Sequence, residues 1–521
     1  MTLGTVLSRV TGLARLAAVT AALGIVESGR LTDAYNYANT APNILYELVL
    51  GGVLTSVFVP VFVELLDKEG RERAWEVGSA IINLVLIVLT AIAVVGIVLA
   101  PLAARFYAAR VGGSQALFES TMTFLLRLFI PQIIFYGLIA VTSGLLNAHK
   151  RFGAPMYTPI LNNLAVIAVF VAWHEAYGAV GDLKQVSDTQ LLVIGLGTTA
   201  GVVLQAIAQL PFLRGLGHYR PTLSLRHPSI RRMASLSVFV IGYVVVNQIG
   251  YLMVQFLAEA DTGAYSAYVS GFIFFMLPHG LFAVSVITAL LPGMSEDATR
   301  RRWEDFRARL STGVRATFLL ILPAAIGYGV LGEPIVRLLL DNGVMTTRSV
   351  DLIVGALRFF VLGLVQFSLF QLLLRAFYAM QDTKTPFLIN LAAVAVNIAV
   401  NIPLSALFGG RGLAAGLSIA YTCGVILQAR ALARRIGGLD GPRILRNCAR
   451  ITLAGAGMGV LVLIAQAILA RLVDHSLTGE LILVLVPVAT GAVAYLGLAM
   501  LLGVEELGLV RGILSRRIAR G

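Results

Sequence analysis

Hydrophobic residues in this chain are grouped into long runs, each about the length of one membrane span. Polar residues are concentrated in the short segments between these runs. About fourteen apolar runs, each longer than 20 residues, are separated by short breaks rich in charged residues, Gly, Pro or Asn. A helix needs about 20 apolar residues to cross a bilayer, and its backbone groups must be hydrogen-bonded within the segment. We therefore expect an all-α polytopic membrane protein with about 14 transmembrane helices, at roughly 3–26, 33–64, 76–104, 119–147, 156–177, 190–213, 233–258, 264–294, 312–340, 350–380, 386–408, 412–433, 448–471 and 480–503.

Part of the chain is duplicated within the sequence. The segment Gly201-Val-Val-Leu-Gln-Ala206 returns as Gly424-Val-Ile-Leu-Gln-Ala429. Three further pairs share an offset of 231 residues: Arg127 with Arg358, Ala148 with Ala379, and Pro155 with Pro386. The pattern predicts two pseudo-symmetric six-helix lobes, at 1–214 and 215–440, and then two additional helices with a short basic cytoplasmic tail at 441–521. Because six is even, both lobes have the same orientation, which suits a transporter that rocks about a central cavity. The alternative is a duplicated static scaffold.

Composition and charge favour the same class of protein. Of the 521 residues, 58% are hydrophobic and only 13% are charged, against about 25% charged residues in soluble domains. The net charge of +13 raises the possibility of a nucleic-acid partner. However, if the N-terminus is cytoplasmic, 27 of the 40 Lys and Arg residues fall in cytoplasmic loops and 8 on the other side. This bias follows the positive-inside rule, so we expect two cytoplasmic termini and no nucleic-acid partner. The remaining five lie inside the runs: Arg9, Arg15, Arg127, Arg315 and Arg358.

The sequence contains none of the common soluble-enzyme motifs. No lysine follows a glycine, which excludes a phosphate-binding P-loop, and His174-Glu175 lacks the second histidine of a zinc-protease helix. The two cysteines, Cys423 and Cys448, lie in or beside apolar runs and predict neither a disulfide framework nor a metal cluster. We therefore expect a secondary or potential-driven transporter without catalytic residues.

Arginines on the first predicted helix are the most informative residues. Ser8, Thr11 and Arg15 recur at i, i+3 and i+7 and share one face, and Arg9 lies beside Gly12. A charge at mid-membrane costs about 2.5–3.5 kcal/mol on insertion scales, so such arginines usually face a water-filled cavity or a partner. Guanidinium groups bind phosphate oxygens through paired hydrogen bonds. We predict that Arg9 and Arg15 bind a phosphate-bearing head group; the alternative for Arg9 is that it snorkels to the cytoplasmic surface.

A polar stripe on the second predicted helix adds further candidates. The stripe has an i, i+3, i+7, i+11 spacing and consists of Asn36, Asn39, Asn43 and Glu47. Asp33 lies near the start of the same helix. Polar stripes in lipid usually face the interior of a helix bundle. We predict that Asp33, Asn43 and Glu47 line the substrate site and that Glu47 pairs with Arg15 or Arg9 when the site is empty. The alternative is an ion pair with a purely structural role.

The second half of the chain contributes weaker candidates. Gln248 and His279 lie well inside apolar runs, and His279 follows Pro278 at an expected kink. This histidine is either a titratable binding group or a hydrogen-bonded core residue. Asn397 and Asn401 form an i, i+4 pair that either contributes to a sodium site or links neighbouring helices. Beyond a coupling ion, Na⁺ or H⁺, we expect no cofactor.

Short motifs along nearly the whole chain resemble the MurJ (MviN) lipid II flippases. They are Ser8 to Arg15, Thr32-Asp-Ala-Tyr35, Pro42-Asn43, Phe58-Val-Pro60, Leu146-Asn147 to Arg151-Phe152 with Pro155, Leu290-Leu-Pro292, and Phe377-Tyr-Ala379 with Gln381-Asp382 and Lys384-Thr-Pro386. The resemblance implies the MOP exporter superfamily fold, in which two extra helices form a groove for a polyprenyl tail. It also implies alternating access that carries lipid II from the inner to the outer leaflet of the bacterial cytoplasmic membrane. Arg9, Arg15 and Asp33 match functional positions of that family.

Several positions depart from the pattern of that family. Leu16 stands where many relatives have an acidic residue, and Tyr46 and Glu47 stand where many have arginines. Ile273 occupies the position of an arginine expected in the cavity. The resemblance therefore implies a cavity that is less basic than in most relatives, with His279 as a partial substitute.

The sequence thus favours a flippase for a lipid-linked peptidoglycan precursor whose pyrophosphate meets Arg9 and Arg15. One alternative is a flippase for another polyprenyl-linked glycan, and another is a MATE-like drug antiporter that would use Asp33 and Glu47. A membrane glycosyltransferase fits less well because the longest outer segment, 178–190, is short. A non-transporting scaffold would not need intramembrane arginines. The expected partners are the precursor, the lipid bilayer and proteins of cell-wall synthesis.

Overall fold

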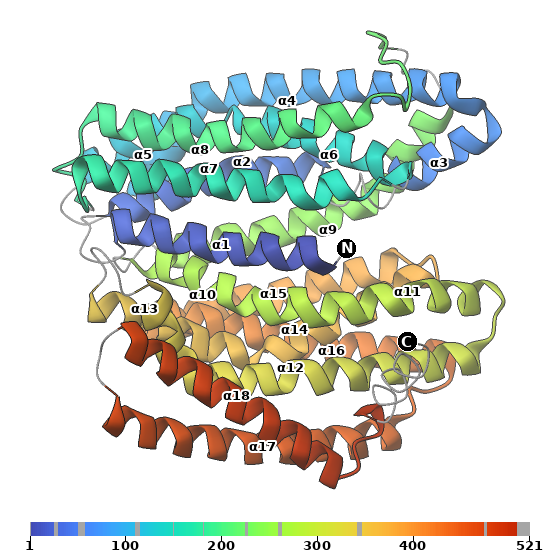
Figure 1. Ribbon diagram of the computed structural model, residues 1–521. Helices are drawn as coiled ribbons and strands as arrows, with labels where there is room; N and C mark the ends of the chain where they lie inside the picture. The colour runs from blue at the N-terminus through green and yellow to red at the C-terminus, as the bar shows by residue number, and fades with distance from the viewer. Residues whose placement is uncertain are drawn as a thin grey trace. The chain divides into compact units, whose positions relative to one another are not determined.

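Every regular element in the described part of the chain is a helix (Figure 1). The computed structural model describes residues 2–24, 30–50, 58–109, 115–149, 151–180, 182–223, 228–258, 263–340, 346–473 and 477–507. Helices are expected because a bilayer offers no partners for unpaired backbone groups. The predicted all-α polytopic fold is confirmed.

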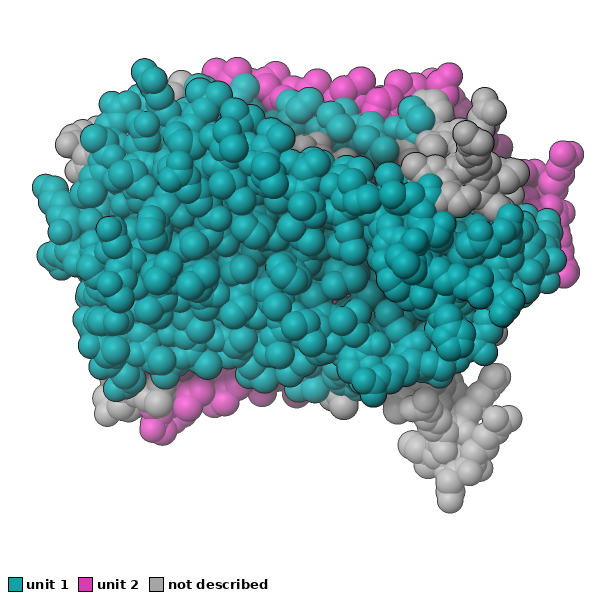
Figure 2. All heavy atoms as spheres, turned by 90° about the horizontal axis from the view of Figure 1, so that it is seen from above, with its two compact units in different colours: residues 1–266, 342–349 teal, residues 267–341, 350–521 magenta. Residues whose placement is uncertain are grey.

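The chain divides into two compact units, coloured separately in Figure 2. Unit 1 comprises residues 1–266 and 342–349. Its helices are α1 (Thr2–Leu23), α2 (Leu31–Leu50), α3 (Val59–Lys68), α4 (Gly70–Ala108), α5 (Gln115–Phe129), α6 (Gln132–Ala148), α7 (Gly153–Tyr177), α8 (Asp188–Gln209), the 3₁₀-helix η2 (Leu210–Leu213) and α9 (Pro228–Ala258). Within this unit α7 lies between α1 and α8 (Figure 1).

Unit 2 comprises residues 267–341 and 350–521. Helix α10 (Ala264–Pro278) begins in unit 1 and continues into unit 2. The π-helix η3 (His279–Ala283) follows it directly, and then come α11 (Val284–Thr299), α12 (Trp303–Leu340), α13 (Thr347–Leu362), α14 (Leu364–Ala379), α15 (Lys384–Phe408), α16 (Gly410–Ile436), α17 (Gly441–Leu472) and α18 (Leu477–Leu501). The predicted lobe boundaries at 214 and 440 stay a prediction.

The number of membrane spans agrees broadly with the prediction. Among the described residues, eleven helical segments are long and apolar enough to cross a membrane. If the bent pair α13–α14 is counted as one further span, the number is twelve. Helices α1 and α2, whose side chains are described only in part, have 22 and 20 residues. At 1.5 Å per residue these two are each about 30 Å long, which is sufficient for a span. The exact total of fourteen stays a prediction.

Several predicted runs correspond to more than one element: the run at 119–147 covers α5 and α6, the run at 264–294 covers α10, η3 and α11, and the run at 350–380 covers α13 and α14. The run at 33–64 covers both α2, which extends to Leu50, and the separate helix α3, which begins at Val59. Hydropathy alone does not locate a junction such as that between α5 and α6, because both sides of it are apolar. The α3 helix carries basic Lys68 in its last turn, where a positive charge interacts favourably with the helix dipole.

Corresponding helices in the two units agree with the sequence duplication. Helices α7 and α15 both have 25 residues, and α4 and α12 have 39 and 38. Both α7 and α15 end at a glycine with positive φ, Gly178 (+71°) and Gly409 (+59°), which are 231 residues apart. A residue with a side chain is strained in that conformation, so glycine is the residue that ends each helix in this way.

Candidate functional site

The two predicted arginines lie on α1, which packs along α7. Asn163 of α7 donates hydrogen bonds to the Ser8 carbonyl oxygen (3.2 Å) and to Thr11 Oγ1 (3.0 Å). These bonds fix the rotation of α1, because the face that carries Ser8 and Thr11 turns toward α7. Arg9 and Arg15 are both half-buried. Within the described part of the chain, neither guanidinium has a hydrogen bond or an ion pair.

Arg15 lies beside polar groups of two other helices of unit 1. Its guanidinium is close enough to Tyr136 of α6 for its charge to act on the Tyr136 hydroxyl, and the amide of Asn43 on α2 also lies near that hydroxyl. The hydroxyl itself donates to Gln132 Oε1 at 3.4 Å. The Tyr46 ring packs against the Tyr136 ring at 5.8 Å between centroids. Asn43 also donates to the Asn39 carbonyl oxygen at 3.1 Å. The structure therefore brings Arg15, Asn43 and Tyr136 together from three helices.

Asp33 is held in a buried hydrogen-bonded position of its own. Its Oδ2 accepts from the Gly263 N–H at 3.0 Å, and its Oδ1 accepts from Ser266 Oγ at 2.5 Å. Asn36 donates to the same Ser266 hydroxyl at 3.0 Å. The carboxylate thus caps the N-terminus of α10, where negative charge is stabilised by the helix dipole. Both of its oxygens are engaged, and no described contact joins Asp33 to Arg15.

The sequence did not predict a network of tyrosines that surrounds Gln255. Gln255 Oε1 accepts from the Tyr107 hydroxyl (2.7 Å), its Nε2 donates to Tyr265 (2.7 Å), and its backbone oxygen accepts from Tyr37 (3.3 Å). The Tyr251 hydroxyl joins Tyr265 at 2.9 Å. The network fixes the end of α9 against α2 and α4. Tyr251 and Gln255 are four residues apart on α9, but Tyr37, Tyr107 and Tyr265 come from three other helices, so sequence periodicity gives no signal for the network as a whole.

His279 is a packed core residue of unit 2. It is 5% exposed, its Nδ1 lies 3.0 Å from Ser368 Oγ, and its ring lies 4.6 Å from the ring of Phe367. It begins the π-helix η3, directly after Pro278. This geometry fits the hydrogen-bonded alternative that the sequence left open for this residue.

The asparagine pair on α15 faces α16. Asn401 Nδ2 donates to Asn397 Oδ1 at 3.1 Å, and both side chains are buried. Asn397 Nδ2 and Asn401 Oδ1 have no hydrogen-bond partner among the described groups. A Cβ added at Gly416 would come within 1.9 Å of Asn401 Oδ1, so glycine is what allows the amide to approach α16. Asn401 therefore presents an open buried acceptor.

The remaining predicted residues have simpler surroundings. Gln248 on α9 and Ile273 on α10 are half-buried. Gln248 makes no hydrogen bond within the described portion, whereas the neighbouring Asn247 donates to the Tyr243 carbonyl oxygen at 2.9 Å. The Glu47 side chain, and with it the predicted pairing with Arg15 or Arg9, lies outside the described side chains.

These features define the class of protein. The chain is a multi-pass helical membrane protein with duplicated helix sets, and it carries in α1 an arginine whose charge no described carboxylate neutralises. Arginines within membrane helices usually face a water-filled cavity or a partner, which is typical of transporters. Together with the relatives below, this makes the chain a membrane transporter rather than an enzyme.

Comparisons with known proteins identify the family. The family model described as "Lipid II flippase MurJ" matches residues 22–483. A relative from Burkholderia cenocepacia, named lipid II flippase MurJ, is 29% identical over 439 residues, which is 83% of this chain and 82% of the relative. The chain belongs to the lipid II flippase MurJ family.

Solved structures show the same fold. A structure described as lipid II flippase MurJ in an inward closed conformation matches with a TM-score of 0.75 and 22% identity, over 96% of this chain and 97% of that one. An inward-facing multidrug resistance MATE family transporter of the MOP superfamily matches with a TM-score of 0.65 and 14% identity, over 85% and 99%. These two similarities show the fold that this chain shares with the MurJ and MATE structures.

Proposed function

We propose that this protein is a flippase that moves lipid II from the inner to the outer leaflet of the bacterial cytoplasmic membrane by alternating access of its two six-helix lobes. Membership of the MurJ family over residues 22–483 supports the substrate. The observation that carries the mechanism is the intramembrane Arg15, which lacks an ion-pair partner among the described groups and whose charge acts on the Tyr136 hydroxyl.

The chemistry of the Arg15 cluster suits a pyrophosphate head group. A guanidinium presents N–H groups in a planar fork that matches two phosphate oxygens. The Tyr136 hydroxyl and the Asn43 amide are polar groups near it, and in this structure they donate to Gln132 Oε1 and to the Asn39 carbonyl oxygen. Arg9, six residues earlier on the same helix, adds a second positive charge toward the end that we place in the cytoplasm. The precursor pyrophosphate would therefore enter past Arg9 and rest at Arg15.

Transport in this proposal is secondary or driven by the membrane potential. An inside-negative potential favours outward movement of an anion by about 2.3 kcal/mol per charge per 100 mV. Both termini are placed in the cytoplasm, because this orientation puts 27 Lys and Arg residues on that side. Proteins of cell-wall synthesis would supply the precursor inside and consume it outside.

Sodium is our proposed coupling ion, with Asn401 and Asn397 as its side-chain ligands. The open Oδ1 of Asn401 is a buried oxygen ligand, and backbone carbonyls commonly complete such sites in transporters. We expect Na⁺ to raise the melting temperature of the purified protein relative to K⁺ at equal ionic strength, and Asn401→Ala to remove that increment. Gln248→Ala serves as the control, because Gln248 lies in the other unit, and this variant should keep the Na⁺-dependent rise in melting temperature. An increment that persists in Asn401→Ala would assign these asparagines to helix packing alone.

A MATE-like drug antiporter is the second candidate because the fold is shared. Such a protein needs free carboxylates for cationic drugs. Asp33 does not supply one, since both of its oxygens accept hydrogen bonds within the N-terminal cap of α10. The arginine in α1 also favours an anionic substrate over a cationic one.

Depletion of the protein in its native cells tests the proposed function. We expect lipid II to accumulate while the fraction accessible from the outer leaflet falls, because synthesis continues inside and export stops. Re-expression of the wild-type chain should restore the outer pool. An unchanged outer pool in depleted cells whose cell-wall synthesis continues would contradict the proposal. Accumulation of another polyprenyl-linked glycan instead would reassign the substrate.

A further inference from the structure

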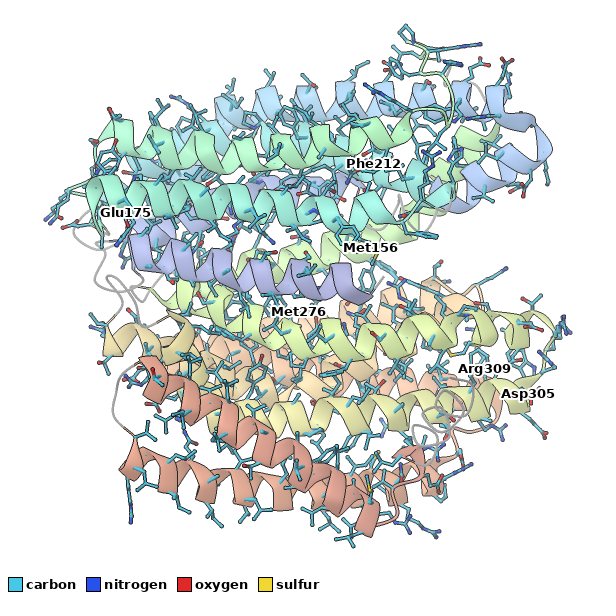
Figure 3. The ribbon with its side chains drawn as sticks, in the orientation of Figure 1. Met156, Glu175, Phe212, Met276, Asp305 and Arg309 are labelled. Atoms are coloured by element: carbon cyan, nitrogen blue, oxygen red, sulfur yellow. The ribbon has the colours of Figure 1, made fainter. Side chains whose placement is uncertain are left out.

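A cavity of about 560 Å³ opens within unit 1, where the beginning of α7 meets the end of α8 and η2. Its walls are largely apolar and include Tyr157, Leu161, Ala208 and Phe212. Thr158 also lines it, but its hydroxyl already accepts a hydrogen bond from Gln209 Nε2 at 3.0 Å. The labelled Phe212 and the α7 residue Met156 mark this region in Figure 3. The volume lies in the range of small-molecule sites.

Arg151 supplies a positive charge at this apolar cavity. Its Nη1 donates to the carbonyl oxygens of Phe212 (2.9 Å) and Arg214 (3.5 Å), which fixes the guanidinium at the end of η2. In the described part of the chain its hydrogen bonds use Nη1 only, so the N–H groups of Nε and Nη2 remain open to a ligand. The side chain is exposed, and no described carboxylate pairs with it.

The backbone at the start of α7 adds to the positive potential. The N-cap residue Phe152 makes no side-chain hydrogen bond to the helix. A Cβ added at Gly153, which lines the cavity, would meet no atom within 4 Å. The first N–H groups of α7 therefore border open space beside Arg151, and helix N-termini favour anions.

The apolar wall of the cavity continues along the flank of α7 and α8. Leu164, Leu204 and Ile207 are 49%, 45% and 54% exposed. In a membrane helix such side chains face acyl chains, so a ligand held at Arg151 has an apolar path that leads into the bilayer. A soluble anion would have no use for that path, and an aqueous protein partner would not reach it.

We propose that this cavity, together with the apolar flank of α7 and α8, forms a groove that binds an anionic membrane phospholipid. The head-group phosphate lies against the open N–H groups of Arg151 and the start of α7, and one acyl chain lies along Tyr157, Leu161 and Phe212. The site is separate from the Arg15 cluster. It holds a lipid that stays in its leaflet, so it is independent of the transported substrate.

Lipid-induced stabilisation of the detergent-purified full chain tests the site. We expect phosphatidylglycerol to raise the melting temperature more than phosphatidylethanolamine does. Arg151→Gln should weaken the apparent affinity for phosphatidylglycerol by about tenfold, the cost of one or two charge-assisted hydrogen bonds. Ala208→Phe fills the groove without changing charge, so it should reduce binding as well. Native mass spectrometry should show fewer retained phosphatidylglycerol molecules in both variants.

Arg220→Gln is the matched control, because Arg220 is exposed in the same unit and does not line the groove. It should keep the wild-type response. Equal responses to the two phospholipids, or equal responses of wild type, Arg151→Gln and Ala208→Phe, would overturn the proposal. An equal loss in Arg220→Gln would also overturn it, since general surface charge would then explain the effect. Stabilisation by lipid II alone would reassign the groove to the transported lipid.

Discussion

Arg15→Ala is expected to abolish lipid II export without destabilising the protein. Each hydrogen bond from a charged donor contributes about 1.5–3 kcal/mol, so loss of the guanidinium costs roughly tenfold or more in affinity per bond to the pyrophosphate. No carboxylate among the described side chains pairs with Arg15, so its removal leaves none of them as an unpaired buried charge. It also removes a charge that costs about 2.5–3.5 kcal/mol at mid-membrane. The melting temperature should therefore stay equal to that of the wild type or rise.

Two measurements check this expectation. Export is followed by complementation in depleted cells and by the lipid II pool on the outer leaflet, and folding is followed by the melting temperature in detergent. Arg15→Lys keeps the charge but not the planar fork, so we expect only partial export. Arg127→Ala, an exposed arginine on α5, should leave export unchanged. Wild-type export by a folded Arg15→Ala protein would remove this arginine from the mechanism.

Arg315→Met is expected to produce the largest loss of stability in unit 2. The Arg315 side chain is 4% exposed and pairs with Glu505 (2.8 Å) and Glu506 (3.1 Å), which follow α18. Glu506 is also 4% exposed, and Asn447 of α17 donates to it. Removing the cation leaves Glu506 buried without its partner, which costs about 3–5 kcal/mol. Unfolding measured in detergent should show a clear drop in melting temperature.

A double substitution separates this effect from lost packing. Arg315→Met with Glu506→Leu removes both charges, and apolar replacement of a whole buried pair is often neutral. We expect the double variant to recover most of the lost stability. Arg443→Met, which breaks an exposed pair with the same Glu505, should have little effect. A double variant as unstable as Arg315→Met would show that packing around the side chain, and not the buried charge, causes the loss.

Hydropathy and repetition were sufficient to predict much of the fold. Apolar runs longer than 20 residues must form helices in lipid, because a helix satisfies its own backbone hydrogen bonds. The 231-residue offset predicted equivalent helices in the two halves of the chain, such as α7 and α15. The junction of α5 and α6 was missed because both flanks are apolar. Helical spacing predicted that Asn43 lies on a polar face of α2. It did not separate Asn43, which reaches Tyr136, from Asp33, which caps α10.

The sequence by itself determined the class of protein, the number of arginines within the predicted spans and the family motifs, because composition and spacing are local properties of the chain. Only the tertiary structure decided how these arginines are paired. Arg15 and Arg315 are equivalent in a hydropathy profile, yet Arg315 pairs with two glutamates that follow α18, whereas no carboxylate among the described side chains pairs with Arg15. Whether a buried charge is a structural ion pair or an open binding group depends on partners that are distant in sequence, and folding alone brings those together.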